Sequence, residues 1–342
     1  MHRCYYQRKK GGMKVLFSAN DAGGANAIAP VIASLAGKGA ELHGALSGPA
    51  QDIFAASGIP FTAGFSASPE IFVAGTSAGD TPDKRIMREL TGTPSLYVLD
   101  FWLNYWQRFS TTGKKDFAYL PTRICVMDEI AKGEMIAEGF PPERLIVTGN
   151  PHFDHFADAI ERADEEAGRI LFISQPLRDI ARMQGYSGAA YDEYASLSDV
   201  VQALESVPEQ FYVSIRLHPK ESDEKYAAYI GSRVRWAPES TIEGAISRSG
   251  LVVGMSSPVL MQAAAAGKRV VSYEPGLAGA DSLVSNRCGV TRRLDTPAGL
   301  AAEFSDYAAG KPSPTTEDFR KFWPQGATER VVAEVYALAV KK

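Results

Sequence analysis

Short apolar segments alternate with longer amphipathic segments along almost the whole chain. In the first half, apolar and β-branched runs predict strands at residues 14–18, 41–47, 71–74, 95–99, 123–127 and 145–148. Segments between them have helical spacing or helix-ending glycines, as at residues 25–37, 49–57, 83–90 and 128–138. This alternation is typical of a parallel sheet that helices cover on both faces.

The same pattern begins again at residue 169. Strands are predicted at residues 169–174, 212–217, 234–236, 251–253 and 269–273, and helices at residues 191–206, 224–230, 241–247, 259–266 and 298–309. Each half is about 150 residues long, which is an ordinary domain size. We therefore predict an α/β protein with two Rossmann-like domains.

The predicted boundaries lie where this pattern stops. Residues 1–12 are basic and contain no apolar run, so we predict a disordered extension. Residues 13–152 form the N-terminal domain, and residues 153–168 form a charged, helical connector. The second domain covers residues 169–326 and ends at a Trp-Pro-Gln-Gly sequence, which the last amphipathic segment, residues 327–342, follows.

Composition and charge exclude several classes of function. A formal net charge of −4 argues against general binding to nucleic acid. No apolar run approaches the roughly 18 residues that a membrane span needs. The basic start leaves peripheral contact with anionic lipid as an alternative to a solvated tail. Cys4, Cys125 and Cys288 are scattered singly, which predicts neither a metal site nor a disulfide framework and favours a reducing cytoplasm.

Residues 250–276 predict a compact strand–turn–helix–strand unit. Its turn contains Ser256 and Ser257, Pro258 suits the first turn of a helix, and Gly267 is placed to end that helix in the left-handed conformation. Two hydroxyls beside the free N–H groups of a helix start suit an anion. Taken alone, the pattern is explained equally well by an ordinary unit with a serine N-cap.

A basic group ends another strand of the same half. Arg216, His218 and Lys220 lie at the end of the strand predicted at residues 212–217. Ligands of open parallel sheets gather beyond the carboxyl ends of the strands, where Glu274 also lies. We expect Arg216 and Lys220 to balance phosphate charge and His218 to bond a phosphate or sugar oxygen. The alternative is a surface turn.

The residues after the first strand indicate a different chemistry. Asn20, Asp21, Gly23 and Gly24 form a loop in which Asp21 either caps the next helix or acts as the general base for an acceptor hydroxyl. The glycines would let a substrate approach the backbone. Asp100, at another strand end, is the second candidate base. The loop has neither GxGxxG nor Walker spacing, which argues against a dehydrogenase and a P-loop NTPase.

The predicted architecture resembles the GT-B glycosyltransferase fold. That fold has two Rossmann-like domains facing a ligand cleft, with a connector after the first domain. Its last helix commonly crosses back onto the N-terminal domain, which implies that residues 327–342 pack there. The resemblance covers residues 13–342 as an architecture.

The Arg-Leu-His-Pro-Lys and Ser-Ser-Pro sequences are similar to motifs of bacterial capsule polymerases, including polysialyltransferases and CDP-glycerol glycerophosphotransferases. In those families the motifs hold the cytidine nucleotide of the donor. The resemblance implies that His218 and Pro219, with Ser256 and Ser257, hold a nucleotide phosphate or ribose. Many sugar transferases also place a glutamate on the donor ribose soon after the serines, and Glu274 is the candidate substitute here.

Two alternatives belong to other classes. UDP-N-acetylglucosamine 2-epimerases typically carry an Asp-Ser-Gly-Gly turn followed by glutamates, where this chain has Gly-Met-Ser-Ser and then Gln262. That difference weakens the resemblance to an epimerase. The other alternative is a non-catalytic protein that binds a sugar nucleotide and lacks a working base.

These expectations combine into one hypothesis. The protein would be a cytoplasmic, metal-independent glycosyltransferase or polyol-phosphate transferase of surface polysaccharide or glycoconjugate biosynthesis, and it would use no cofactor. Its partners would be a nucleotide-sugar donor, lying between the two domains, and a saccharide or glycoconjugate acceptor.

Overall fold

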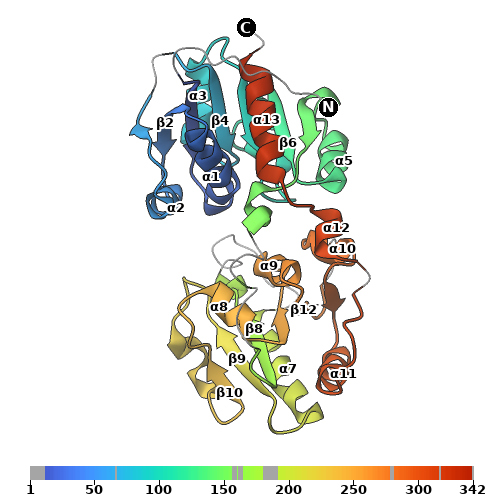
Figure 1. The fold of residues 1–342 in the computed structure, drawn as a ribbon. Helices are drawn as coiled ribbons and strands as arrows, with labels where there is room; N and C mark the ends of the chain where they lie inside the picture. The colour runs from blue at the N-terminus through green and yellow to red at the C-terminus, as the bar shows by residue number, and fades with distance from the viewer. Residues whose placement is uncertain are drawn as a thin grey trace, which may run out of the picture. The chain divides into compact units, whose positions relative to one another are not determined.

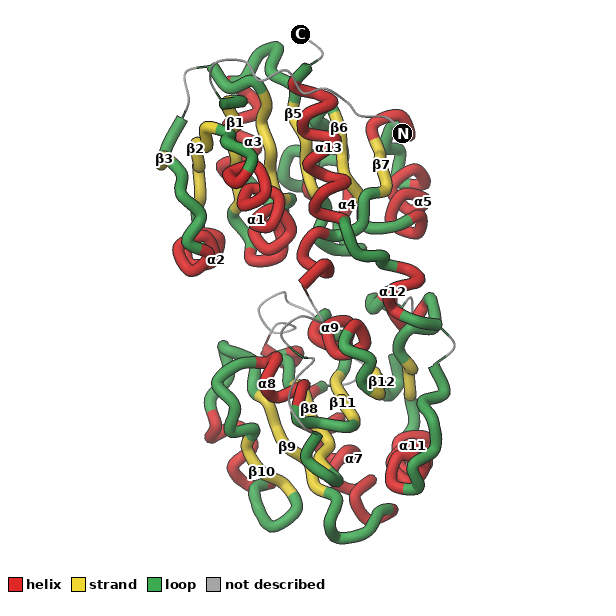
Figure 2. The backbone as a smooth tube through the Cα atoms, in the orientation of Figure 1, coloured by secondary structure: helices red, strands yellow, loops and turns green. Residues whose placement is uncertain are grey.

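The computed structural model describes residues 12–65, 68–155, 160, 165–179, 192–277, 281–315 and 317–340. The chain forms two compact units (Figures 1 and 2). The first domain consists of Met1–Asp154 together with Trp323–Lys342, and the second is His155–Phe322. No helix within the described residues is long and apolar enough to cross a membrane.

The first domain is built on a seven-stranded parallel sheet in the order β3-β2-β1-β4-β5-β6-β7. Its strands are β1 (Lys14–Ala19), β2 (Glu41–Leu46), β3 (Thr62–Ala63), β4 (Ile71–Gly75), β5 (Ser95–Val98), β6 (Arg123–Val126) and β7 (Leu145–Val147). Its helices are α1 (Ala22–Gly37), α2 (Ala50–Ser57), α3 (Pro82–Glu89), α4 (Tyr105–Arg108), α5 (Glu129–Ala137) and α13 (Ala327–Ala339), with 3-10 turns at Pro142–Arg144 and Pro151–His155.

Both faces of this sheet are buried, as the continuous apolar runs of its strands require. On one face, Val15 and Phe17 belong to a core that includes α1 and α13, which lie side by side in Figure 1. On the other face, Tyr97 lies between Phe72 and Phe109. The centroid of its ring is 6.0 Å from that of Phe72 and 5.8 Å from that of Phe109. Alternate residues of each strand therefore fill two separate layers.

Residues far apart in the sequence fasten the returning chain to the first domain. The indole N–H groups of Trp102 and Trp323 donate to the same oxygen of Asp128, at 2.9 and 2.8 Å. Asp154 caps α13 by accepting the backbone N–H of Thr328 at 2.8 Å and of Gly326 at 2.9 Å. The last helix thus crosses back onto the N-terminal domain, as the resemblance to the GT-B fold implies.

The second domain has a six-stranded parallel sheet in the order β10-β9-β8-β11-β12-β13. Its strands are β8 (Arg169–Ile173), β9 (Tyr212–Arg216), β10 (Val234–Trp236), β11 (Leu251–Gly254), β12 (Arg269–Tyr273) and β13 (Arg292–Leu294). Its helices are α7 (Glu193–Ala203), α8 (Ile242–Ser247), α9 (Val259–Ala265), α10 (Val284–Arg287), α11 (Pro297–Ala308) and α12 (Phe319–Phe322), with 3-10 segments η3 (Leu204–Ser206) and η4 (Asp223–Tyr229).

The predicted fold class is confirmed, because both sheets are parallel and both have a Rossmann-like strand order. The sequence pattern missed only short elements among the described residues, such as β3, β13 and α4. The segment predicted as helix 224–230 is the 3-10 segment η4. Most of the helix predicted at residues 153–167, and most of the disordered extension, lie outside the described residues. In the described part of the connector, Pro151–His155 is a 3-10 turn and residues 165–168 are not helical.

Candidate functional site

The strand order of the second domain reverses between β8 and β11. At such a switch point, ligands bind beyond the carboxyl ends of the strands. Gln175, two residues after β8, joins the two sides because its side-chain oxygen accepts the Ser256 N–H at 3.0 Å. The predicted turn at Ser256 and Ser257 therefore lies at the switch point itself.

The two serines have different environments. The Ser257 hydroxyl is buried and accepts the Val259 N–H at 3.3 Å at the start of α9. Ser256 is half-buried, and its hydroxyl has no partner among the described residues. Gly267 ends the helix at φ +72°, so the left-handed conformation predicted for it is confirmed. Of the two, Ser256 is the better placed to bond a ligand.

His218 is held as a hydrogen-bond donor. Its Nδ1 accepts the backbone N–H of Lys220 at 3.2 Å, so the neutral ring carries its proton on Nε2. Burial lowers the pKa of His218, and the neighbouring Lys220 and Lys225 act in the same direction while Glu221 opposes them. At neutral pH the ring thus offers one N–H, and Lys220 beside it is exposed and charged.

Arg216 and Glu274 are placed differently from what we predicted. The Arg216 guanidinium donates to the carbonyl oxygens of Glu239 and Ser240, so it fastens the chain before α8 as well as supplying charge. Glu274 is wholly buried and accepts the Ser272 hydroxyl at 2.8 Å. In this conformation a ribose cannot reach Glu274, which corrects the role that we assigned to it.

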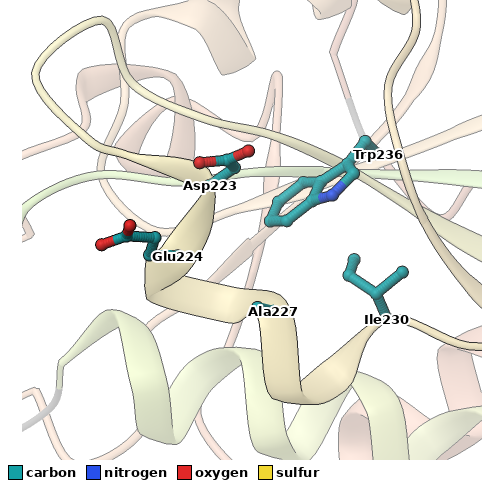
Figure 3. Close-up of a pocket in the computed structure, with 5 residues that line it drawn as sticks. All are labelled: Asp223, Glu224, Ala227, Ile230 and Trp236. Atoms are coloured by element: carbon teal, nitrogen blue, oxygen red, sulfur yellow. The ribbon is translucent and has the colours of Figure 1, made fainter.

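A surface pocket of about 330 Å³ lies beside the edge strand β10. Figure 3 shows the indole of Trp236, the last residue of β10, extending between Asp223 and Ile230. Ala227 forms the opposite side, and the carboxylate of Glu224 points away from the ring. The sequence pattern identified Trp236 only as a strand residue, although an aromatic residue at a carboxyl end is itself an indication of a binding surface.

The first domain presents a second polar group at its own switch point, between β1 and β4. A Cβ on Gly23 would lie 2.0 Å from an Asp100 oxygen, and one on Gly24 would lie 2.7 Å from the Thr76 carbonyl oxygen. We predicted that these glycines leave room for a substrate. The structure corrects this, because the close approach is to the chain's own Asp100 and Thr76.

Asp100 is strongly engaged. One of its oxygens accepts the Thr76 hydroxyl at 2.6 Å and an Arg108 N–H at 2.7 Å. Both charged side chains are 11% exposed. Asp100 therefore positions Arg108 and the β4 loop, and the oxygen that makes both bonds is already engaged, which leaves it less available to an acceptor hydroxyl.

Asp21 is the freer of the two carboxylates. It occupies the N-cap position of α1, but its side chain accepts no capping hydrogen bond. Its partner is Asn20, whose amide donates at 2.6 Å while the Asn20 carbonyl accepts the Ser47 hydroxyl at 2.6 Å. Asn20 thus orients a half-buried carboxylate that helix capping does not consume.

A buried lysine, Lys84, holds the loop that follows β4. Lys84 is 1% exposed, and its ammonium donates to the carbonyl oxygens of Gly79 at 2.6 Å and Gln107 at 3.2 Å. It fixes the loop after β4 against α4, which carries Arg108. Neither Lys84 nor Arg108 lies in a recognisable motif, so the sequence pattern identifies neither of them as a site residue.

Among solved structures, several match this chain in fold over nearly its whole length. A putative UDP-N-acetylglucosamine 2-epimerase from Listeria monocytogenes has a TM-score of 0.65 and 15% identity over 97% of this chain and 98% of its own. The UDP-N-acetylglucosamine 2-epimerase from Neisseria meningitidis, solved with UDP-N-acetylglucosamine bound, has a TM-score of 0.63 and 14% identity over 95% and 100%. The glycosyltransferase of kitacinnamycin has a TM-score of 0.62 and 14% identity over 97% and 100%.

The chain has the GT-B fold. At these identities the likeness establishes the fold and leaves the activity to the site residues. No protein-family model and no curated protein matches the sequence.

Proposed function

We propose that this GT-B protein is an enzyme that acts on a nucleotide sugar and transfers the sugar, or a polyol phosphate, to an acceptor for surface polysaccharide or glycoconjugate. The observation that carries the proposal is the set of donors along the carboxyl edge of the second sheet. His218 offers its Nε2–H, Lys220 an exposed ammonium and Ser256 a hydroxyl. These are the groups that hold phosphate oxygens in proteins.

The leaving nucleotide would be stabilised by the same groups. Negative charge develops on its phosphate as the sugar departs, and preorganised donors lower the energy of that charge without reorganising. His218 and Lys220 supply such donors from one turn, and Arg216 adds positive charge close by. A structural neighbour solved with UDP-N-acetylglucosamine supports a sugar nucleotide as the ligand class.

The nucleobase would bind in the pocket at β10. The flat apolar face of Trp236 suits stacking, and Asp223 at its rim suits a base N–H. Asp21 would be the general base for the acceptor hydroxyl, since its carboxylate is half-buried, oriented by Asn20 and not consumed by capping.

An epimerase acting on the same class of ligand is the second candidate. It is favoured by the two 2-epimerases among the structural neighbours described above. The two activities differ in one respect, because an epimerase changes its nucleotide sugar without an acceptor.

A thermal-shift screen identifies the ligand. We expect CMP, CDP, UDP or GDP, or one of their sugars, to raise the Tm of the wild-type protein by mass action. Lys220→Ala should weaken that shift, whereas Lys311→Ala, which removes an exposed lysine paired with Asp306, should leave it unchanged. The nucleotide sugar that binds is then incubated alone and followed by proton NMR. Epimerisation without acceptor would replace the transferase proposal, and absence of any shift would contradict both activities.

A further inference from the structure

The turn that carries His218 is closed by reciprocal hydrogen bonds. The Glu221 N–H donates to the His218 carbonyl oxygen at 2.9 Å, and the His218 N–H donates to the Glu221 carboxylate at 2.8 Å. Pro219 occupies the second position of this turn, where its fixed φ is favourable. With the Lys220 N–H on Nδ1, these contacts determine both the backbone and the ring of His218.

The Glu221 carboxylate is itself held from the other side. Its side chain is 1% exposed, and its second oxygen accepts the Lys225 ammonium at 2.5 Å and the Ser174 hydroxyl at 3.0 Å. Lys225 also donates to Glu193 at 2.5 Å, so two buried carboxylates share one ammonium. Such a group is costly to desolvate, and a packed apolar cluster in its place is often as stable or more stable. A contribution to stability is therefore a weak explanation for a charged residue at position 221.

Ser174 connects this buried network to the switch point. It is the first residue after β8, and its neighbour Gln175 accepts the Ser256 N–H. Consecutive side chains at the end of one strand thus hold the His218 turn, through Glu221, and the Ser256 turn. The relative placement of the two groups that we assign to the nucleotide depends on this pair of contacts.

We propose that Glu221 is a positioning residue that acts through His218. Its buried carboxylate holds the turn in which the ring keeps its proton on Nε2 and presents that N–H to the ligand. The proposal rests on the nucleotide-binding role given to His218 above, and its first readout requires no ligand.

The first test is the tautomer of His218 in the full-length protein, read from long-range proton–nitrogen NMR and assigned by the loss of its signals in His218→Gln. In the wild type at neutral pH we expect the neutral Nε2–H form. Glu221→Gln should give a mixture of tautomers. The amide cannot accept from all the donors that the carboxylate accepts, so the turn that places the Lys220 N–H on Nδ1 of His218 should no longer be held firmly. Glu205→Gln, an exposed glutamate of the same domain, is the matched control. An unchanged tautomer in Glu221→Gln would overturn the proposal.

The second test is a double-mutant cycle on the affinity for UDP. Glu221→Gln should weaken binding on the order of tenfold in the wild-type background and less than twofold in His218→Ala, because coupled residues are not additive. Equal losses in both backgrounds would show a merely structural role and overturn the proposal. Ser174→Ala, which keeps the charged pairs, provides the same readouts if Glu221→Gln does not fold. If the wild type binds neither UDP nor any other nucleotide of the thermal-shift screen, the tautomer alone decides the proposal, and the assignment of nucleotide binding fails separately.

Discussion

At the scale of single residues, the two carboxylates proposed as general bases differ clearly in their hydrogen-bond partners. Asp100 is paired with Arg108 and Thr76, whereas Asp21 is bonded through the Asn20 amide and caps nothing with its side chain. Both could be named from the sequence, because Asp100 directly follows a predicted strand and Asp21 lies in the loop after another. Their difference could not, since the partner Arg108 lies in the short helix α4 that the pattern did not reveal.

Asp21→Asn tests this assignment. The amide keeps the size of the side chain but cannot accept a proton at neutral pH, so turnover should fall by about 100-fold or more while nucleotide affinity stays within twofold. Single-turnover kinetics and calorimetry measure the two quantities. Full activity in Asp21→Asn would remove this residue from the chemistry, and an equal loss of binding would make its role one of positioning.

The buried carboxyl group of Asp83 makes the stability of the folded protein depend on pH. Burial raises the pKa of Asp83, although Thr81, Lys84 and Tyr97 oppose the shift. A raised pKa means that the folded state holds the proton more tightly than the unfolded state. Stability is therefore lost as pH rises from the usual aspartate value through the raised one.

Asp83→Asn should accordingly raise the Tm at pH 7, and the gain should shrink as pH falls toward about 4, where the unfolded carboxyl also becomes protonated. Thermal denaturation followed by circular dichroism between pH 4 and 8 measures the difference. A variant that is less stable than wild type at pH 7 would show that the ionised carboxylate stabilises the fold.

At the scale of elements, the last helix packs in the core of the first domain, and the segment before it is fastened there by a few polar contacts that no local pattern predicts. Residues 327–340 are recognisably amphipathic, so the helix could be predicted, and the Trp-Pro-Gln-Gly break marks its start. The partners of that break lie far away in the chain, since Trp323 donates to Asp128 and packs edge-to-face on Trp102 with ring centroids 5.7 Å apart.

Trp323→Phe keeps an aromatic ring in this cluster and removes the N–H that Asp128 accepts. Leaving a buried carboxylate with one donor fewer should lower the free energy of unfolding by about 1–3 kcal/mol. Chemical denaturation followed by circular dichroism measures it. Trp106→Phe is the control, because the structure gives the Trp106 indole no hydrogen bond among the described residues. Equal stability of Trp323→Phe and wild type would show that the indole bond contributes nothing.

At the scale of the whole molecule, the strand and helix alternation was sufficient to predict two parallel α/β domains, and the resemblance to the GT-B fold implied the returning helix. The site was predicted only in outline. His218 and Ser256 lie at strand ends and could be found by position, but the Glu221 carboxylate is held by Ser174, 47 residues away in the sequence, and Gln175 bonds Ser256, 81 residues away. Their roles follow from tertiary placement. Glu274 is the opposite case. It lies at a strand end and was predicted to bind the ligand, but it is wholly buried.

The central claim is that the carboxyl edge of the second sheet holds a nucleotide. Titration calorimetry with the nucleotide that the thermal-shift screen selects, on the wild type, His218→Ala and Ser256→Ala, tests it most directly. We expect each substitution to weaken binding by about tenfold, because each removes a hydrogen bond to a charged phosphate. Unchanged affinity in both variants would contradict the claim.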